Sequence, residues 1–157
     1  MRVGIGYDIH RFEPGRALIL GGVPFEGETG LAGHSDADVL LHAIIDALLG
    51  AAGLGDIGAQ FPPGDPQWKD ASSVQLLEEA AGMLVVRRLS VDYVDCTVIA
   101  ERPKIAARIP EMRRQIARAA GLPVARVNVK ATTNEGLGAI GRGEGIAAMG
   151  VAALSEA

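Results

Sequence analysis

The chain has 157 residues, and 48% of them are hydrophobic although aromatic residues make up only 4%. This length suits one compact domain spanning residues 1–157 with a core of its own. The net charge of −4 argues against general nucleic-acid binding, which requires a basic excess. No apolar run approaches the roughly 20 residues of a membrane span, and no signal pattern begins the chain, so we expect a cytoplasmic protein. Cys96 is the only cysteine, which excludes an intrachain disulfide and a cysteine-rich zinc site.

The first half of the chain is expected to contain two strands and one helix. Residues 2–8 and 17–20 have strand character, and Gly21-Gly22 predicts a turn after them, which together indicate a short N-terminal hairpin. A glycine-rich loop should follow. Apolar residues at helical spacing then predict a helix over 36–52. The segment 53–70 contains several glycines and prolines, which indicates a long ordered loop of the kind that usually carries function.

The second half alternates between helices and strands. We expect a helix from Ser72 or Ser73 to about residue 88, a strand over 91–100, a helix over 106–120, and strands over 126–133 and 145–154. No sustained repeat of strand, helix and parallel strand is visible. The pattern therefore predicts an α+β fold, with a mixed four-stranded sheet, helices layered on one face and the short N-terminal hairpin.

Three residues of the first half have the character of metal ligands. Asp8 and His10 end the first predicted strand, where residues two apart point to the same side. His42 lies among apolar residues of the predicted helix, where an unpaired ring would be costly. Together they suit a zinc site with an open fourth position, although a surface pair and a satisfied core histidine are the alternative. Asp38 and Asp46 lie four residues on either side of His42, so either could orient its ring.

The residues that lead into the first predicted helix suggest an anion site. Ser35 is predicted to cap this helix, with Asp38 as a partner three residues later. The free amides at the helix N-terminus could also form a phosphate seat together with His34. Both interpretations can hold, because a cap and an anion site use neighbouring donors.

Two further polar segments lie near the C-terminal end. Thr132 and Thr133 offer hydroxyls for a diphosphate, and Glu135 offers a carboxylate for a bridging Mg²⁺. Residues 138–145 alternate glycine with charge, which indicates either close approach of the backbone to a ligand or a simple turn.

Five separated blocks of the sequence resemble the methylerythritol cyclodiphosphate synthases. They are residues 6–10, 31–39, 47–52, 54–58 and 141–145, and their shared order is far more specific than any one of them. The resemblance implies a homotrimer of α+β subunits, with active sites between neighbouring chains.

The resemblance also implies a reaction. In this family the 2-phosphate of 4-diphosphocytidyl-2-C-methyl-D-erythritol 2-phosphate attacks the β-phosphorus, which forms 2-C-methyl-D-erythritol 2,4-cyclodiphosphate and releases CMP in the non-mevalonate isoprenoid pathway. Such a reaction depends mainly on positioning and on neutralising charge. Two alternatives are a phosphoesterase that uses metal-bound water and a trimeric nucleotide-binding protein with a structural metal. The second would need four protein ligands, whereas three are visible.

Individual residues are implied by the same resemblance. Asp8, His10 and His42 are expected to bind Zn²⁺, Glu135 to bind Mg²⁺ or Mn²⁺, and His34 and Thr133 to act in catalysis. Some family members carry an aromatic residue where this chain has Ala139. The expected substrate-binding residues are Asp8, His10, His34 and Ser35, then Asp56, Ile57, Gly58, Phe61, Pro62, Pro63, Gly64 and Asp65, the cytidine pocket Ala100, Pro103, Lys104, Ile105 and Ala106, the diphosphate contacts Thr132, Thr133, Asn134 and Glu135, and finally Ala139 and Arg142.

Overall fold

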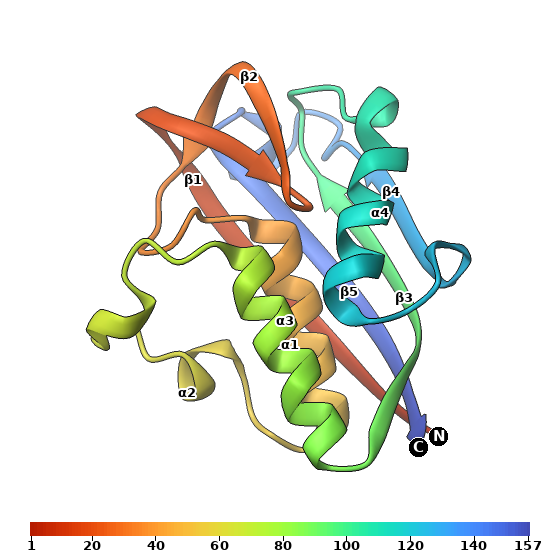
Figure 1. Ribbon diagram of the computed structural model, residues 1–157. Coiled ribbons are helices and arrows are strands. Elements are labelled where there is room, and N and C mark those ends of the chain that lie inside the picture. The colour runs from red at the N-terminus through yellow and green to blue at the C-terminus, as the bar shows by residue number, and fades with distance from the viewer.

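The central sheet of the computed structural model, which describes residues 1–157, has five strands in the order β2-β1-β5-β3-β4 (Figure 1). The strands are β1 (Arg2–Leu20), β2 (Val23–Leu31), β3 (Leu89–Ile99), β4 (Val127–Thr132) and β5 (Gly145–Glu156). β3 and β4 are parallel, whereas the other neighbours are antiparallel. The predicted α+β fold with a mixed sheet is therefore confirmed. The prediction of four strands is wrong, because the sheet has five.

The additional strand lies where a glycine-rich loop was expected. The two predicted N-terminal strands are one long strand, β1, and β2 pairs with its second half across register shifts between Glu13 and Leu18. Glycines in β2 lower its strand propensity, but Gly30 has a packing reason. A Cβ atom there would lie 2.4 Å from the carbonyl oxygen of Ala17, so only glycine allows the two strands to approach. Tertiary contact thus outweighs local propensity.

The helices are α1 (Val39–Ala52), α2 (Ile57–Gln60), α3 (Ser73–Val86), α4 (Ile109–Ala120) and α5 (Gly138–Gly141). Three of them, α1, α3 and α4, lie on the same side of the sheet (Figure 1), as predicted. The helix expected over 106–120 begins later, because Ala106–Arg108 form a 3₁₀ turn. The expected loop over 53–70 contains α2 and a second 3₁₀ turn. No helix combines the length and the apolar character needed to cross a membrane.

Close contact between α1 and β1 positions the candidate site. A Cβ atom at Gly4 or Gly6 would lie 2.0 or 1.9 Å from carbonyl oxygens of α1, so the absent side chains let the helix backbone rest on the strand. Alternate residues of a strand point to the same face. Asp8 and His10 therefore continue the row of Gly4 and Gly6 toward the N-terminal end of α1, where His42 lies.

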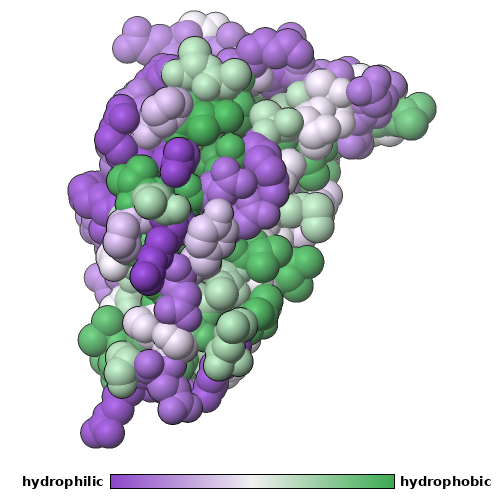
Figure 2. Space-filling model, turned by 90° about the vertical axis from the view of Figure 1, so that its right-hand side faces the viewer, coloured by the Kyte–Doolittle hydropathy of each residue, from purple (hydrophilic) through white to green (hydrophobic).

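The opposite face of the sheet is apolar and no helix covers it. In Figure 2, hydrophobic residues gather along the right-hand border of the lower half, the side away from the helices. Exposed apolar area of this kind is typical of surfaces that bind another protein, a membrane or a ligand. We call it the uncovered sheet face, and its large exposed residues are Val3, Ile5, Tyr7, Ile9, Tyr93, Met149 and Val151.

Candidate metal centre

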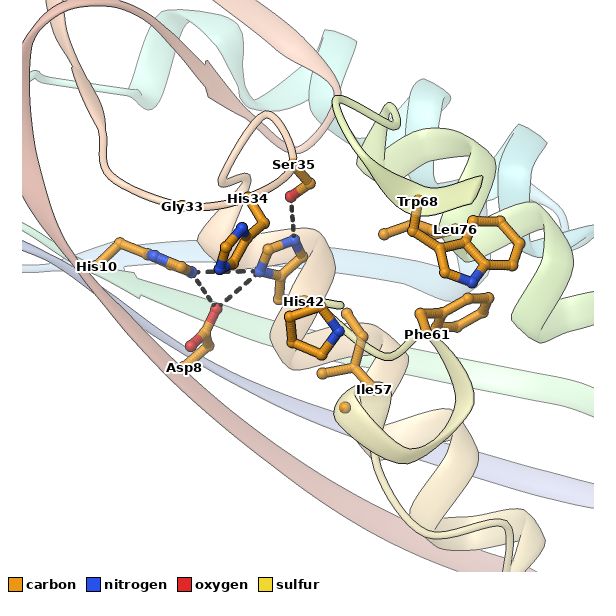
Figure 3. Close-up of a pocket in the computed structure, with 12 residues that line it drawn as sticks. Asp8, His10, Gly33, His34, Ser35, His42, Ile57, Phe61, Trp68 and Leu76 are labelled. Atoms are coloured by element: carbon orange, nitrogen blue, oxygen red, sulfur yellow. Dashed lines mark hydrogen bonds and ion pairs between the residues drawn. The ribbon is translucent and has the colours of Figure 1, made fainter. Parts of the chain in front are cut away.

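Asp8, His10 and His42 converge at one point between β1 and α1 (Figure 3). The Asp8 Oδ2 atom lies 2.8 Å from His10 Nε2 and 3.0 Å from His42 Nδ1, and the two nitrogens are 3.3 Å apart. The side chains of Asp8, His10 and His42 are 26%, 20% and 12% exposed, so the point is reachable from solvent on one side. The structure thus brings together the three residues that the sequence singled out, and we call them the metal cluster.

The charges of Asp8 and the two histidines shift the pKa values within the metal cluster. Burial by itself would raise the pKa of the Asp8 carboxyl, but hydrogen bonds and positive charge from His10 and His42 hold it well below its usual range. Burial lowers the pKa of His10, whereas the hydrogen bond and negative charge of Asp8 raise it, and the net shift is upward. The carboxylate is therefore ionised at neutral pH and favours cations at this point.

The second ring nitrogen of His42 contacts neither Asp38 nor Asp46, the two predicted partners. His42 Nε2 lies 3.1 Å from Ser35 Oγ and 3.0 Å from Ser73 Oγ. Asp46 instead accepts a hydrogen bond from the Ile57 amide. The prediction that Asp38 or Asp46 orients this ring is wrong, because both carboxylates are committed to backbone amides.

Asp38, not Ser35, caps α1. Its completely buried carboxylate accepts hydrogen bonds from the amides of Gly21, Gly22 and Leu41, which ties the turn between β1 and β2 to the start of the helix. Burial and the charge of Asp36 raise the pKa of Asp38 to about 6, against the effect of these amides. The predicted Ser35 cap is wrong because Ala37 adopts a left-handed φ of 56°, which delays the helix to Val39.

A pocket of about 260 Å³ opens beside the metal cluster (Figure 3). The rings of Phe61 and Trp68 lie edge to face on its far side, with centroids 5.0 Å apart, and Leu76 adds a further apolar wall. The pocket brings together many of the expected site residues: Asp8, His10, His34, Ser35, His42, Ile57, Gly58, Phe61 and Pro63.

Other residues of the expected substrate loop lie next to this pocket but do not line it. Asp56 is exposed and caps α2, and its carboxylate accepts a hydrogen bond from the Ala59 amide. Asp65 caps the following 3₁₀ turn. Pro62 and Gly64 are exposed between them. These residues therefore present polar groups and backbone at the rim.

The expected cytidine and diphosphate residues form a separate group, which we call the cytidine half: Ala100, Pro103, Lys104, Ile105, Ala106, Thr132, Thr133, Asn134 and Glu135. The strand register places Ile9, Ala147, Ile99 and Thr132 in one row across β1, β5, β3 and β4. At about 4.8 Å per strand, Ile9 and Thr132 are roughly 14 Å apart within one chain. One chain does not bring the two groups together.

Side-chain and backbone contacts hold the cytidine half together. The Ala100 amide donates to the Thr132 carbonyl at 3.0 Å, and the Asn134 amide donates to the Glu101 carboxylate at 2.9 Å. Glu135 is exposed, with a left-handed φ of 52°, and its amide donates to Thr133 Oγ1. This turn therefore presents the Glu135 carboxylate and the threonine hydroxyls on the surface.

Ala139 and Arg142 lie in a third region near the start of β5, where His10 of the metal cluster lines the same cavity as Ala139. Ala139 lines a second cavity of about 680 Å³ near the start of β5, together with Arg102 and Glu144. Arg142 is exposed, and its Nε donates to Glu144 Oε1 at 2.6 Å. The pair restrains the glycine-rich segment that was expected either to approach a ligand or to form a turn.

Sequence reasoning missed four residues that contribute to these sites. Trp68 and Leu76 line the pocket, Glu101 fastens the cytidine half, and Ser73 contacts His42. Ser73 was recognised only as a possible helix cap, and Ser72 takes that role. The only signal for Ser73 in the sequence was the pair of adjacent serines. A helix needs one cap, so the second serine was available for another role.

Comparison with known proteins identifies the relatives of this chain. It is 57% identical over 156 residues to the 2-C-methyl-D-erythritol 2,4-cyclodiphosphate synthase of Gloeobacter violaceus, covering 99% of this chain and 96% of that protein. The synthase of Symbiobacterium thermophilum is 54% identical over 155 residues, with 99% of both chains covered. A solved structure of such a synthase in its CDP-bound form is 35% identical, with a TM-score of 0.90 over 98% of this chain and 100% of that chain. A model of the YgbB family matches residues 1–155, and the chain belongs to this family.

Proposed function

We propose that the chain is a cyclodiphosphate synthase, acting as one domain over residues 1–157. Its reaction would convert 4-diphosphocytidyl-2-C-methyl-D-erythritol 2-phosphate to 2-C-methyl-D-erythritol 2,4-cyclodiphosphate and CMP, in the non-mevalonate isoprenoid pathway. The observation that carries the proposal is the metal cluster of Asp8, His10 and His42 at the edge of a pocket, in a chain that aligns over its length with enzymes of that name.

The donor set of the metal cluster fits zinc. Neighbouring ligands of a tetrahedral zinc ion with bonds of about 2.0–2.1 Å lie about 3.3 Å apart. The donor atoms here are already 2.8 to 3.3 Å apart, so little movement would be needed. Three protein ligands leave one position for a substrate oxygen, where zinc would polarise the β-phosphate.

The pocket residues suit a reaction between two phosphates. A 2-phosphate oxygen forms the new bond to the β-phosphorus, and the bond from that phosphorus to the CMP oxygen breaks, so no protein nucleophile is required. His34 and Ser35 line the pocket and can hold the attacking phosphate through hydrogen bonds. The apolar wall of Phe61, Trp68 and Leu76 limits the access of water, which favours ring closure over hydrolysis.

The cytidine half suits the leaving group. The exposed Lys104 and the hydroxyls of Thr132 and Thr133 offer donors for phosphate oxygens, and Thr133 could stabilise the shifting charge. Glu135 offers a single carboxylate, which matches the way Mg²⁺ or Mn²⁺ is held between one protein ligand and a diphosphate. The ion would neutralise charge on the departing CMP.

We infer a homotrimer with active sites shared between neighbours. Two observations support this. The uncovered sheet face is apolar and needs a partner, and the metal cluster and the cytidine half are separated by two intervening strands. In a cyclic trimer each interface joins two different surfaces, so the metal cluster of one subunit could meet the cytidine half of the next.

Product analysis tests the reaction. The purified protein with Zn²⁺ and Mg²⁺ should convert the proposed substrate to a cyclic diphosphate and CMP in equal amounts, measured by phosphorus NMR. Release of a linear phosphate product would indicate a phosphoesterase instead. Binding of the nucleotide without turnover would indicate a nucleotide-binding protein.

A further inference from the structure

The tautomer of His42 determines whether its inner nitrogen can bind a metal. A neutral imidazole carries one proton, and only the other nitrogen has a free electron pair for a metal. His42 Nδ1 faces the metal cluster, whereas Nε2 points away from it toward two serine hydroxyls. The partner of Nε2 therefore decides which nitrogen remains free.

The Ser73 hydroxyl has a fixed direction. Its proton is donated to Asp36 Oδ1, while Asp36 Oδ2 accepts the Ser73 amide 3.0 Å away. Ser73 is completely buried, so no water competes for these contacts. With its proton committed to Asp36, Ser73 Oγ presents only electron pairs to His42 Nε2, at 3.0 Å. It can only accept a hydrogen bond from Nε2–H, so a neutral ring that keeps this bond leaves Nδ1 free for a metal, which would replace the contact of Nδ1 with Asp8 Oδ2.

Ser35 is a less constant partner of the same nitrogen. Its hydroxyl accepts the Ala37 amide, but no carboxylate holds its proton. It also lines the pocket next to His34, where we propose that it binds phosphate. When substrate draws this hydroxyl away, Ser73 remains the partner of His42.

The same logic operates on the other histidine of the metal cluster. His10 Nδ1 lies 2.6 Å from the Ala32 carbonyl oxygen, which can only accept a hydrogen bond. When the ring is neutral, this carbonyl holds its proton on Nδ1, and Nε2 can give its free pair to a metal that replaces its contact with Asp8 Oδ2. The two rings present different nitrogens to the metal, and each is selected by an acceptor on its outer side.

We propose that Ser73, oriented by Asp36, is a positioning residue that holds His42 in the tautomer with a free Nδ1 and so raises the zinc affinity of the metal cluster. The inference rests on the proposed metal site. Loss of an outer partner of a metal-binding histidine typically lowers metal affinity about 10- to 100-fold.

The adjacent serines provide a matched pair of variants. Ser73→Ala should weaken zinc binding about 10- to 100-fold in competition with a chelator. Ser72→Ala removes the hydroxyl that accepts the Val74 amide and caps α3, so it should lower the melting temperature without weakening zinc binding. Asp36→Asn, which leaves the Ser73 hydroxyl in place but loosens its direction, should weaken zinc binding by a smaller factor.

A spectroscopic readout separates orientation from general destabilisation. In the zinc-loaded protein, long-range proton–nitrogen NMR should show a slowly exchanging proton on His42 Nε2, which Ser73→Ala should make fast-exchanging. Excess zinc should restore turnover to Ser73→Ala, because its ligands are intact. Equal zinc affinity in Ser72→Ala, Ser73→Ala and Asp36→Asn would overturn the proposal. If Ser73→Ala does not fold, Asp36→Asn carries the same test. Failure of the unaltered protein to bind zinc would contradict the proposed metal site itself.

Discussion

The metal cluster and the cytidine half are built in different ways. The metal cluster stands on β1 and α1, whose backbones touch at Gly4 and Gly6, and every polar atom that faces it has a partner within the same chain. The cytidine half stands on exposed turns that follow β3 and β4. The first is therefore complete in a single chain, whereas the second turns its groups outward. Under the proposed function, such a chain would bind the metal alone and would need a neighbour for chemistry.

The largest effect should come from removing a ligand. His42→Ala leaves two ligands, so the variant should lose stoichiometric zinc and more than about a thousandfold in turnover while remaining folded. Zinc content by mass spectrometry and the phosphorus NMR assay measure the two effects. His34→Ala is the control, because it should lose turnover and keep zinc. Stoichiometric zinc in His42→Ala would remove this residue from the site.

A change in the cytidine half should spare the metal. Glu135→Gln should bind zinc as tightly as the unaltered protein but turn over about a hundredfold more slowly, since a stabiliser of the transition-state charge is lost. When Mg²⁺ is titrated at a fixed substrate concentration, the turnover of this variant should depend less strongly on Mg²⁺. Glu26→Gln, at an exposed position of β2, should behave like the unaltered protein. Unchanged turnover of Glu135→Gln at limiting Mg²⁺ contradicts the assignment.

The pH dependence of zinc binding should report on the metal cluster alone. Burial lowers the pKa of His10, but Asp8 raises this pKa by more than burial lowers it. The ring is therefore protonated up to a higher pH than the ordinary 6.5. Below that raised pKa, zinc must displace one proton, and the apparent affinity should fall about tenfold per pH unit. Asp8 stays ionised there because its pKa is lowered. Chelator competition across pH measures the slope, which should be the same in His34→Ala. A flat profile would show that His10 is not a ligand.

The smallest expected signal tests whether the two regions meet between chains. Asp8→Ala and the double variant Lys104→Ala, Thr133→Ala should each be nearly inactive. When equal amounts are unfolded and refolded together, about half of the metal clusters and half of the neighbouring cytidine halves are intact, so about a quarter of wild-type activity should return. A site within one chain predicts no recovery. Mixed trimers without activity, as seen by mass spectrometry, refute the shared site.

The sequence alone was sufficient where local spacing decides the outcome. Asp8 and His10 share a face because strand residues alternate, and the helices over α1 and α3 follow from their apolar periodicity. The mixed sheet and the helix-covered face followed from the order of these elements. The resemblance to a known family also rested on short blocks of adjacent residues.

Tertiary structure decided the features that depend on distant partners. β2 forms because it lies against β1, although its glycines predict a loop. Ser73 contacts His42 although 31 residues separate them in the sequence, and Asp38 contacts Gly21 across 17 residues. Neither contact could follow from helical spacing. The separation of the cytidine half from the metal cluster depends on strand order. The physical reason is that a buried polar atom takes whichever partner packing brings within hydrogen-bonding distance, and only the folded chain determines that partner.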